Sequence, residues 1–267
     1  MALAREAVAV KSDEDFGTTA ASLTGFNLDC GTTGNRVAFV GVMWNRDFNH
    51  TITGITIGGN AMTALAAHFQ FVARGQWFEY IAPGTGNQSV VVSHDGGTGG
   101  GARDVLIVAV SYSGAHQTDP SSGYATASGT STNLDLTVAS QTGDEVLVLG
   151  GAYINVTYTT DDAGATELAD AYSGSAGGIS HMVSARPGAA SVATEHTPSS
   201  SAQWTALGFS VVPAAAAATS GAGVNRGLEA PPATRSAIVG AMKRMGNLFV
   251  PYHTIYRPRL VPVGISL

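Results

Sequence analysis

Hydrophobic positions along most of the chain recur in short runs that are typical of β-strands. Residues 36–44 and 104–112 are almost continuously apolar, which predicts a buried strand at 36–44 and a central strand buried on both faces at 104–112. Residues 51–57 and 134–138 instead alternate apolar and polar positions, which predicts strands with one buried and one wet side. Helical periodicity is almost absent before residue 213.

Further strand-like runs are separated by Gly-rich and Pro-containing turns at intervals of roughly 8–15 residues. Strands are expected at residues 76–81, 89–93, 145–153, 179–184, 191–195 and 203–212, and a strand or a short helix at 61–71. A parallel sheet needs crossover helices, and none is indicated. We therefore expect an all-β fold, a two-layer antiparallel β-sandwich of about a dozen strands that occupies residues 1–213.

The composition changes sharply after Pro213. Residues 214–225 form an Ala/Gly-rich linker, and residues 226–267 combine basic residues, prolines and large apolar side chains. A C-terminal helix is expected at 235–247, with Thr234 as its N-cap and Gly246 at its end. Three prolines beyond it favour an extended arm rather than a central strand.

Charge divides the chain in the same way. Residues 1–225 carry 7 Lys and Arg against 18 Asp and Glu, a net −11, whereas residues 226–267 carry 6 against 1, a net +5, and the two sum to −6. The C-terminal arm is too apolar to stay solvated as an ordinary disordered tail. We expect it to dock on another subunit, the alternative being that it packs back on its own body. The residues expected to make this assembly contact are Ile238, Met242, Met245, Phe249, Tyr252, Tyr256, Arg257, Arg259 and Leu260.

Motifs for catalysis are missing. The sequence has no G-x-S-x-G elbow and no Walker A motif, and its 7 histidines are scattered singly without metal-ligand spacing. The single cysteine, Cys30, excludes an intramolecular disulfide and is expected to fill a partly buried position. We predict no catalytic residue, no metal and no cofactor, so the protein is not expected to be an enzyme. A site assembled from distant loops, with His94 or His181 beside a carboxylate, is the remaining catalytic alternative.

Composition also bears on the ligands that the protein can bind. Nucleic-acid binding is disfavoured, because the body is acidic and the basic residues of the arm are spread among apolar ones. No apolar run approaches the roughly 20 residues that cross a bilayer. Aromatic residues beside polar ones can stack on sugars. The possible glycan contacts are Trp77, Tyr112 and Tyr153, although a core position is the competing interpretation for such residues.

The order of segments resembles the jelly-roll-like β-sandwich of tailed-phage virion proteins. The resembling segments are residues 35–44, 55–63, 77–86, 90–93 and 110–115, within a similarity that covers roughly residues 20–212. The similarity lies in strand edges and turns, so it implies a sandwich used for virion surfaces, tails or adhesion and transfers no functional residue. Residues 226–267 fall outside it.

Together these observations predict a non-enzymatic virion structural protein of a phage-like particle, a capsid-decorating or tail-associated subunit. It is expected to assemble through its arm with copies of itself or with other virion proteins. A receptor- or glycan-binding adhesion module, on a phage tail or a cell surface, is the alternative. The N-terminus does not resemble a signal peptide, so synthesis in the host cytoplasm and location in the virion are expected.

Overall fold

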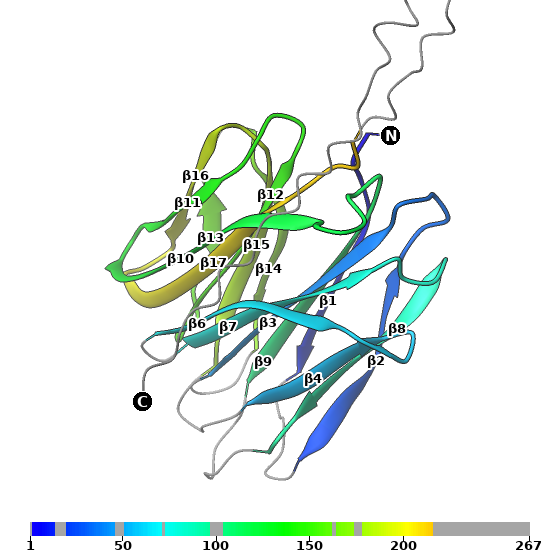
Figure 1. Ribbon diagram of the computed structural model, residues 1–267. Coiled ribbons are helices and arrows are strands. Elements are labelled where there is room, and N and C mark those ends of the chain that lie inside the picture. Colours follow the sequence, from blue (N-terminus) through cyan, green and yellow to red (C-terminus); the bar gives the residue numbers. More distant parts are fainter. Residues whose placement is uncertain are drawn as a thin grey trace, which may run out of the picture. The chain divides into compact units, whose positions relative to one another are not determined.

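The computed structural model of the protein describes residues 2–13, 20–45, 51–70, 73–96, 104–161, 164–173 and 178–215 (Figure 1). These residues form β-strands and turns, and no helix occurs among them. They belong to a compact unit that ends at Ala217. The all-β prediction is therefore confirmed, whereas the expected helix at 235–247 and the arm at 226–267 lie outside the described residues.

The N-terminal half forms two antiparallel sheets, which we call the N-terminal sandwich. Its five-stranded inner sheet has the order β1-β9-β3-β7-β6, and its four-stranded outer sheet has the order β2-β8-β4-β5. The bounds of these strands are β1 Ala4–Asp13, β2 Ala21–Asp29, β3 Val37–Asn45, β4 Ile52–Ile57, β5 Asn60–Ala61, β6 Thr63–Gln70, β7 Ala73–Ile81, β8 Asn87–His94 and β9 Val105–Ser113.

The second half forms the C-terminal sandwich in the same way. Its inner sheet has the order β10-β17-β12-β15-β14, and its outer sheet has the order β11-β16-β13. The bounds are β10 Ser121–Ser131, β11 Leu134–Ala139, β12 Glu145–Ala152, β13 Tyr158–Thr160, β14 Thr166–Tyr172, β15 Ser180–Pro187, β16 Ser191–Pro198 and β17 Ala202–Val211.

The two sandwiches share one topology. Replacing β1, β9, β3, β7 and β6 by β10, β17, β12, β15 and β14 turns the first inner-sheet order into the second, and β2, β8 and β4 likewise become β11, β16 and β13. In the N-terminal sandwich, β1-β9-β3-β7 and β2-β8-β4-β5 interleave along the chain as the strands of a jelly roll do, with β6 added at the edge. The chain therefore contains two copies of one supersecondary plan.

Matching residues accompany the matching strands. Thr33-Gly34 leads into β3 as Thr142-Gly143 leads into β12, each followed by two polar residues and a valine. Strands β8 and β16 share the pattern Ser-Val followed four residues later by His, at 89–94 and 191–196. Corresponding residues at corresponding places in the fold indicate an internal duplication.

Three apolar clusters join the four sheets into one stack. The first lies between the N-terminal outer and inner sheets, the second between the two inner sheets, and the third between the C-terminal inner and outer sheets. The prediction of a single two-layer sandwich over residues 1–213 is therefore wrong, because the body has four layers. Figure 1 shows the two sandwiches as neighbouring sets of strands.

The inner sheets face each other with two-fold pseudosymmetry. Strand β1 contacts β14 at one margin, and β6 contacts β10 at the other, so each edge of one sheet meets the opposite edge of its counterpart. Strands β3 and β12, which correspond in the duplication, contact each other near the centre. Such a contact is isologous, because the same surface is used on both sides.

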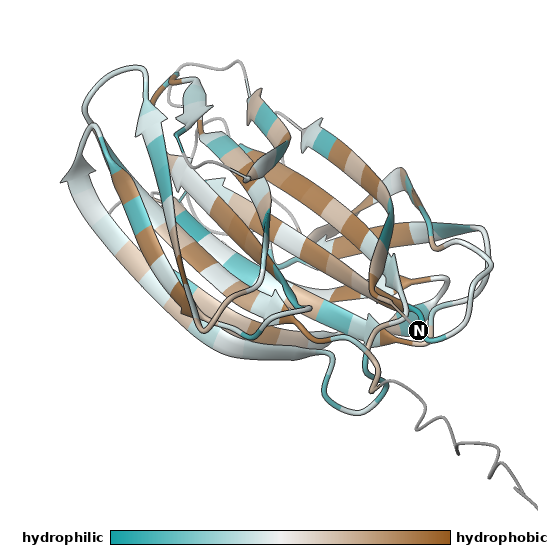
Figure 2. Ribbon diagram, turned by 90° about the horizontal axis from the view of Figure 1, so that it is seen from above, coloured by the Kyte–Doolittle hydropathy of each residue, from teal (hydrophilic) through white to brown (hydrophobic). Residues whose placement is uncertain are grey.

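Aromatic side chains fill the centre of this contact. Trp77 meets the ring of Phe209 edge-on at 5.3 Å, and Phe209 meets Phe39 at 4.8 Å. The indole of Trp77 donates a hydrogen bond to the Leu207 carbonyl on the facing sheet, at 3.4 Å. A side chain at Gly41 is excluded, since its Cβ would lie 2.9 Å from the Trp77 ring. Figure 2 shows apolar residues concentrated on the central strands.

Truncating Trp77 should therefore loosen the two sandwiches. We expect Trp77→Ala to lower the free energy of unfolding by about 3–5 kcal/mol, as is usual for removal of a buried tryptophan. Urea denaturation followed by circular dichroism measures the change. Tyr153→Ala, at a partly exposed position after β12, is the matched control and should cost less than about 1 kcal/mol. Equal losses in the two variants would contradict the central role of Trp77.

Candidate functional site

The structure separates the three aromatic residues that were expected to contact a glycan. Trp77 and Tyr112 are 1% and 0% exposed and belong to the cluster between the inner sheets, so their prediction as glycan contacts is wrong. A ring enclosed on both faces by other side chains has no face left for a sugar. Tyr153 is partly exposed, and it does not lie beside the other two on a common surface. The assembly residues expected between Ile238 and Leu260 lie outside the described residues.

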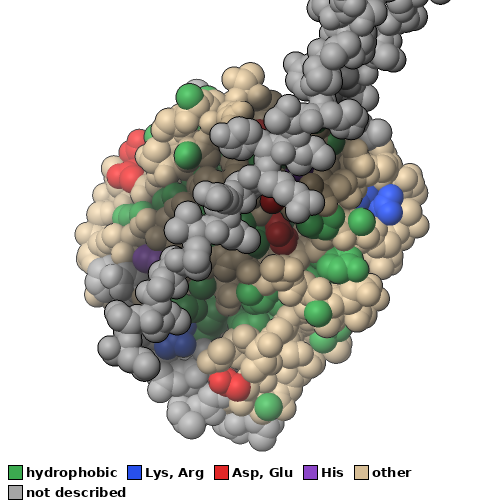
Figure 3. Space-filling model, in the orientation of Figure 1, with side chains coloured by type: hydrophobic (Ala, Val, Ile, Leu, Met, Phe, Trp, Pro, Cys, Tyr) green, Lys and Arg blue, Asp and Glu red, His purple; other side chains and the backbone are tan. Residues whose placement is uncertain are grey.

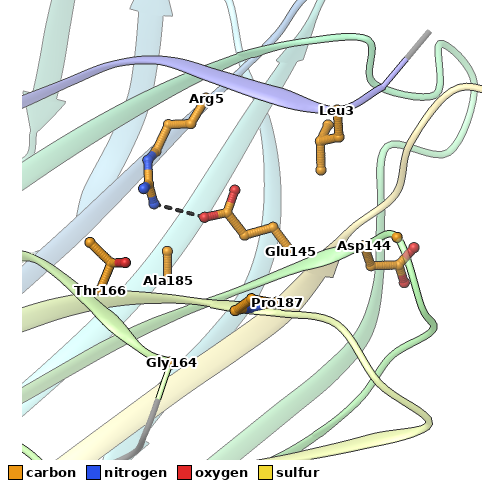
Figure 4. Close-up of a pocket in the computed structure, with 9 residues that line it drawn as sticks. Leu3, Arg5, Asp144, Glu145, Gly164, Thr166, Ala185 and Pro187 are labelled. Carbon is orange, nitrogen blue, oxygen red and sulfur yellow. Dashed lines mark hydrogen bonds and ion pairs between the residues drawn. The ribbon is translucent and has the colours of Figure 1, made fainter.

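A pocket opens where the two sandwiches meet, and we call it the seam pocket (Figure 4). Its volume is about 330 Å³. Arg5 of β1 and Leu3, which immediately precedes this strand, line the pocket from the N-terminal sandwich, and the remaining lining comes from the C-terminal sandwich. The lining residues from the C-terminal sandwich are Gly143, Asp144, Glu145, Gly164, Thr166, Ala185 and Pro187.

An ion pair crosses the seam pocket. The Arg5 guanidinium donates from Nη1 to Oε1 of Glu145 at 2.7 Å, and the two side chains are 25% and 21% exposed (Figure 4). Burial raises the pKa of the Glu145 carboxyl, and the neighbouring Arg5 charge opposes that rise. The pKa of the nearby Tyr112 hydroxyl is raised well above its usual range, chiefly by burial. The two charges neutralise each other, so this pair links the sandwiches electrostatically.

A second polar group fixes the turn on the pocket wall. The Asp144 carboxylate accepts hydrogen bonds at one oxygen from the Ser210 hydroxyl at 2.7 Å and from the Gln141 amide at 3.0 Å. The Gly188 amide donates to the Asp144 carbonyl at 2.8 Å. These bonds hold the β11–β12 turn against β15 and β17, so Asp144 is a structural residue of the pocket wall.

The described part of the chain ends beside this pocket. The Ala214 amide donates to the Gly114 carbonyl at 2.7 Å, and Pro213 forms an isolated bridge with Ala115. A Cβ on Gly114 would collide with the Ala2 backbone, next to the pocket residue Leu3. Backbone pairing of the body thus continues through Ala214, one residue past the expected boundary at 213.

The histidines do not form a reactive centre among the described residues. His94 accepts a hydrogen bond at Nδ1 from the Gly96 amide at 3.1 Å, as a loop cap. His196 lies 3.1 Å from the Ser184 hydroxyl, a Ser–His contact whose members are 0% and 1% exposed inside the C-terminal sandwich. A substrate cannot reach that serine in the folded protein, so the contact acts as a core hydrogen bond.

His181, the other candidate, is fully buried, and neither ring nitrogen has a hydrogen-bond partner in the described structure. Cys30 is also fully buried, and burial raises the pKa of its thiol to about 11, which disfavours the reactive thiolate. No group of three or more His, Cys, Asp or Glu side chains among the described residues is arranged to hold a metal ion.

Comparison of the chain with protein-family models, with curated protein sequences and with solved structures gave no match. In the described segments, no helix of the length and apolar character needed to span a membrane occurs.

The surface is polar and carries few charges. Figure 3 shows charged side chains scattered singly over one face, among apolar and uncharged polar residues. Large apolar side chains at the surface are equally scattered: Val10, Phe69, Tyr124 and Ile154 are the exposed ones among the described residues. They come from different strands and turns, so these four residues do not mark a single apolar patch for binding a partner.

The ion pair across the seam pocket makes a pH-dependent contribution. In Arg5→Met, Glu145 stays partly buried without its counterion, so we expect a loss of about 1–2 kcal/mol at pH 7, modest because the pair is partly exposed. The folded-state pKa of Glu145 is already raised, and removal of Arg5 raises it further. Mild acid protonates the carboxyl in the folded state, so the deficit should shrink between pH 7 and pH 5.

Denaturation of the single and double variants at both pH values measures this contribution. Glu145→Gln should rescue Arg5→Met in the double variant, because no uncompensated charge is left. A deficit that is independent of pH, or a double variant as unstable as Arg5→Met, would show that the charges are not coupled.

His181 should make the body sensitive to acid. Burial lowers the pKa of its imidazole from 6.5 to about 4, so the unfolded chain binds a proton that the folded chain excludes between these values. Stability should therefore fall as the pH drops from 7 to 4, by up to about 3 kcal/mol from this group.

The variant His181→Leu isolates the contribution of the imidazole. It should be at least as stable as the natural protein near pH 4.5 and should show a flatter dependence on pH in urea denaturation. An unchanged pH dependence in this variant would exclude His181 as the source.

Proposed function

We propose that this protein is a structural subunit that assembles into a larger particle through residues 226–267. The carrying observation is that all strands of the four described sheets lie before Pro213, and that the last backbone hydrogen bond among the described residues is made by Ala214. Among the described residues, each of these sheets is formed without any residue after Val211. The arm, with its net charge of +5 and its apolar residues, is available for another surface.

The construction of the body supports a scaffolding role. The aromatic side chains of Phe39, Trp77, Tyr112 and Phe209 pack between the two sandwiches and are not displayed to solvent. Rigid, doubly packed sheets with few charges suit a subunit that lies close to its neighbours. Its acidic balance, −11 over residues 1–225, also complements the basic arm of an adjoining copy or particle protein.

The particle that we propose is phage-like, with the protein as a capsid-decorating or tail-associated subunit located in the virion. This part of the proposal rests on the resemblance of residues 20–212 to the jelly-roll-like sandwich of tailed-phage virion proteins. The interleaved strand order of the N-terminal sandwich accords with it. The alternative adhesion function has less support, since Trp77 and Tyr112 are buried.

Removal of the arm tests the proposal. A chain that ends at Ala217 keeps the Pro213 bridge and the Ala214 hydrogen bond, so its thermal unfolding and near-UV circular dichroism should match those of the full chain. Its mass in sedimentation velocity should fall, because the contacts made by the arm are lost. An assembly size unchanged by the truncation would overturn the proposal.

Substitutions in the full chain provide the matched control. Phe249→Asp with Leu260→Asp should weaken assembly as the truncation does, because an apolar contact becomes charged. Arg257→Glu with Arg259→Glu should weaken it most at low salt, because screening reduces charge attraction between arm and body. Each pair should leave the unfolding of the body unchanged.

A further inference from the structure

The edges of the inner sheets differ in how they are protected. An exposed edge strand offers unpaired backbone N–H and C=O groups, and proteins block it with charges, prolines, bulges or a short strand. The four sheets formed by the described residues have eight edge strands. Strands β5 and β13 have only two and three residues. Strands β2 and β11 carry Asp29 and Asp135.

The inner sheets show a sharper contrast between their two margins. At one margin, β1 carries Arg5, Glu6, Lys11 and Asp13, and its neighbour β14 carries two further carboxylates. At the opposite margin, β6 and β10 contact each other and contain no Asp, Glu, Lys, Arg or proline. The internal duplication makes β10 the counterpart of β1, so the same position in the fold is charged in one copy and uncharged in the other.

Strand β10 is the longer of the two uncharged edges. All four edges of the inner sheets contain a bulge, so a bulge does not distinguish them. After its bulge at Ser122–Ala125, β10 runs in regular register with β17 from Ala125 to Ser131, whereas the corresponding run of β6 after its bulge extends only from Ala67 to Gln70. Beyond β17, no strand of the described structure pairs with β10.

We propose that the outer edge of β10 pairs with β10 of a second copy of this chain. Antiparallel pairing joins the two five-stranded inner sheets into one continuous sheet across a two-fold axis, which is the arrangement that identical subunits use most often. Identical strands are self-complementary in this direction. A neutral strand also brings no like charges together in any register, whereas a β1 pair centred on Val8 would set Arg5 opposite Lys11 of the copy.

The side chains of β10 suit such a pair. Ala125 and Ala127 pack toward the C-terminal outer sheet, and Gly129 lies against the Trp204 ring. Thr126 and Thr130 alternate with them and are exposed. In an antiparallel register centred on Ser128, Thr126 lies opposite Thr130, and threonine pairs are favourable cross-strand neighbours.

Cross-linking of the full chain tests the proposal. Two-fold pairing centred on Ser128 sets this residue opposite its own copy, at the Cα separation of about 4.5–5.5 Å that a disulfide can span. We expect Ser128→Cys to yield a covalent dimer as the main product of mild oxidation on a non-reducing gel. The natural protein should yield none, because Cys30 is buried.

A matched cysteine on the charged edge is the control: Val10→Cys, at an exposed position of β1, should remain uncross-linked. Adding Thr126→Lys and Thr130→Lys to Ser128→Cys should reduce the covalent dimer about tenfold or more, because lysines block edge pairing. Absence of the Ser128→Cys dimer, or a dimer unaffected by the lysines, would overturn the proposal. The readout is separate from the arm, since Phe249→Asp with Leu260→Asp should leave this cross-link intact.

Discussion

The contact between the two inner sheets is the constraint on which the rest of the body depends. Each of these sheets is covered on its other face by an outer sheet. Their strands are therefore buried on both sides and shielded from water. Rings from Phe39, Trp77 and Phe209 meet at the centre and hold the facing sheets in one alignment. The seam pocket and its ion pair exist only because that alignment brings β1 beside β12 and β14.

Much of the fold could be predicted from the sequence where burial is strong. The run at 36–44 was expected to form a buried strand and the run at 104–112 a strand buried on both faces, and β3 and β9 are buried at every position. In an antiparallel sandwich of two layers, each strand has one wet face. Strands buried on both faces therefore already indicated that their sheets lie between two others. From that pattern, a fold of more than two stacked layers could have been predicted.

Edge strands were harder to predict. Strand β10 consists of Ser, Thr, Gly and Ala around one tyrosine, residues whose intrinsic preference for strands is low or mixed. Its pairing with β17 over most of its length determines its conformation. In strand β14, apolar and polar residues likewise do not alternate regularly, and pairing with β15 sets its register. Tertiary contacts override local preference in both cases.

The candidate site could not be predicted from the sequence for a different reason. Burial of Trp77 and Tyr112 depends on which sheet covers their strands, and strand sequences do not show which sheet stacks on which. The coupling of Arg5 to Glu145 spans 140 positions of sequence, which is too far for local spacing to reveal it. The duplication was a usable signal: Thr-Gly before β3 and β12, and Ser-Val with His on β8 and β16, are visible in the chain without coordinates.

The duplication has a consequence for how the body responds to dilution. Two separate copies of a sandwich that associate through such an isologous face dissociate at low concentration, and their stability depends on the amount of protein present. Here a short connection between β9 and β10 joins the copies, so each faces its partner at an effective concentration in the millimolar range. The paired body can therefore form in a single chain at any expression level.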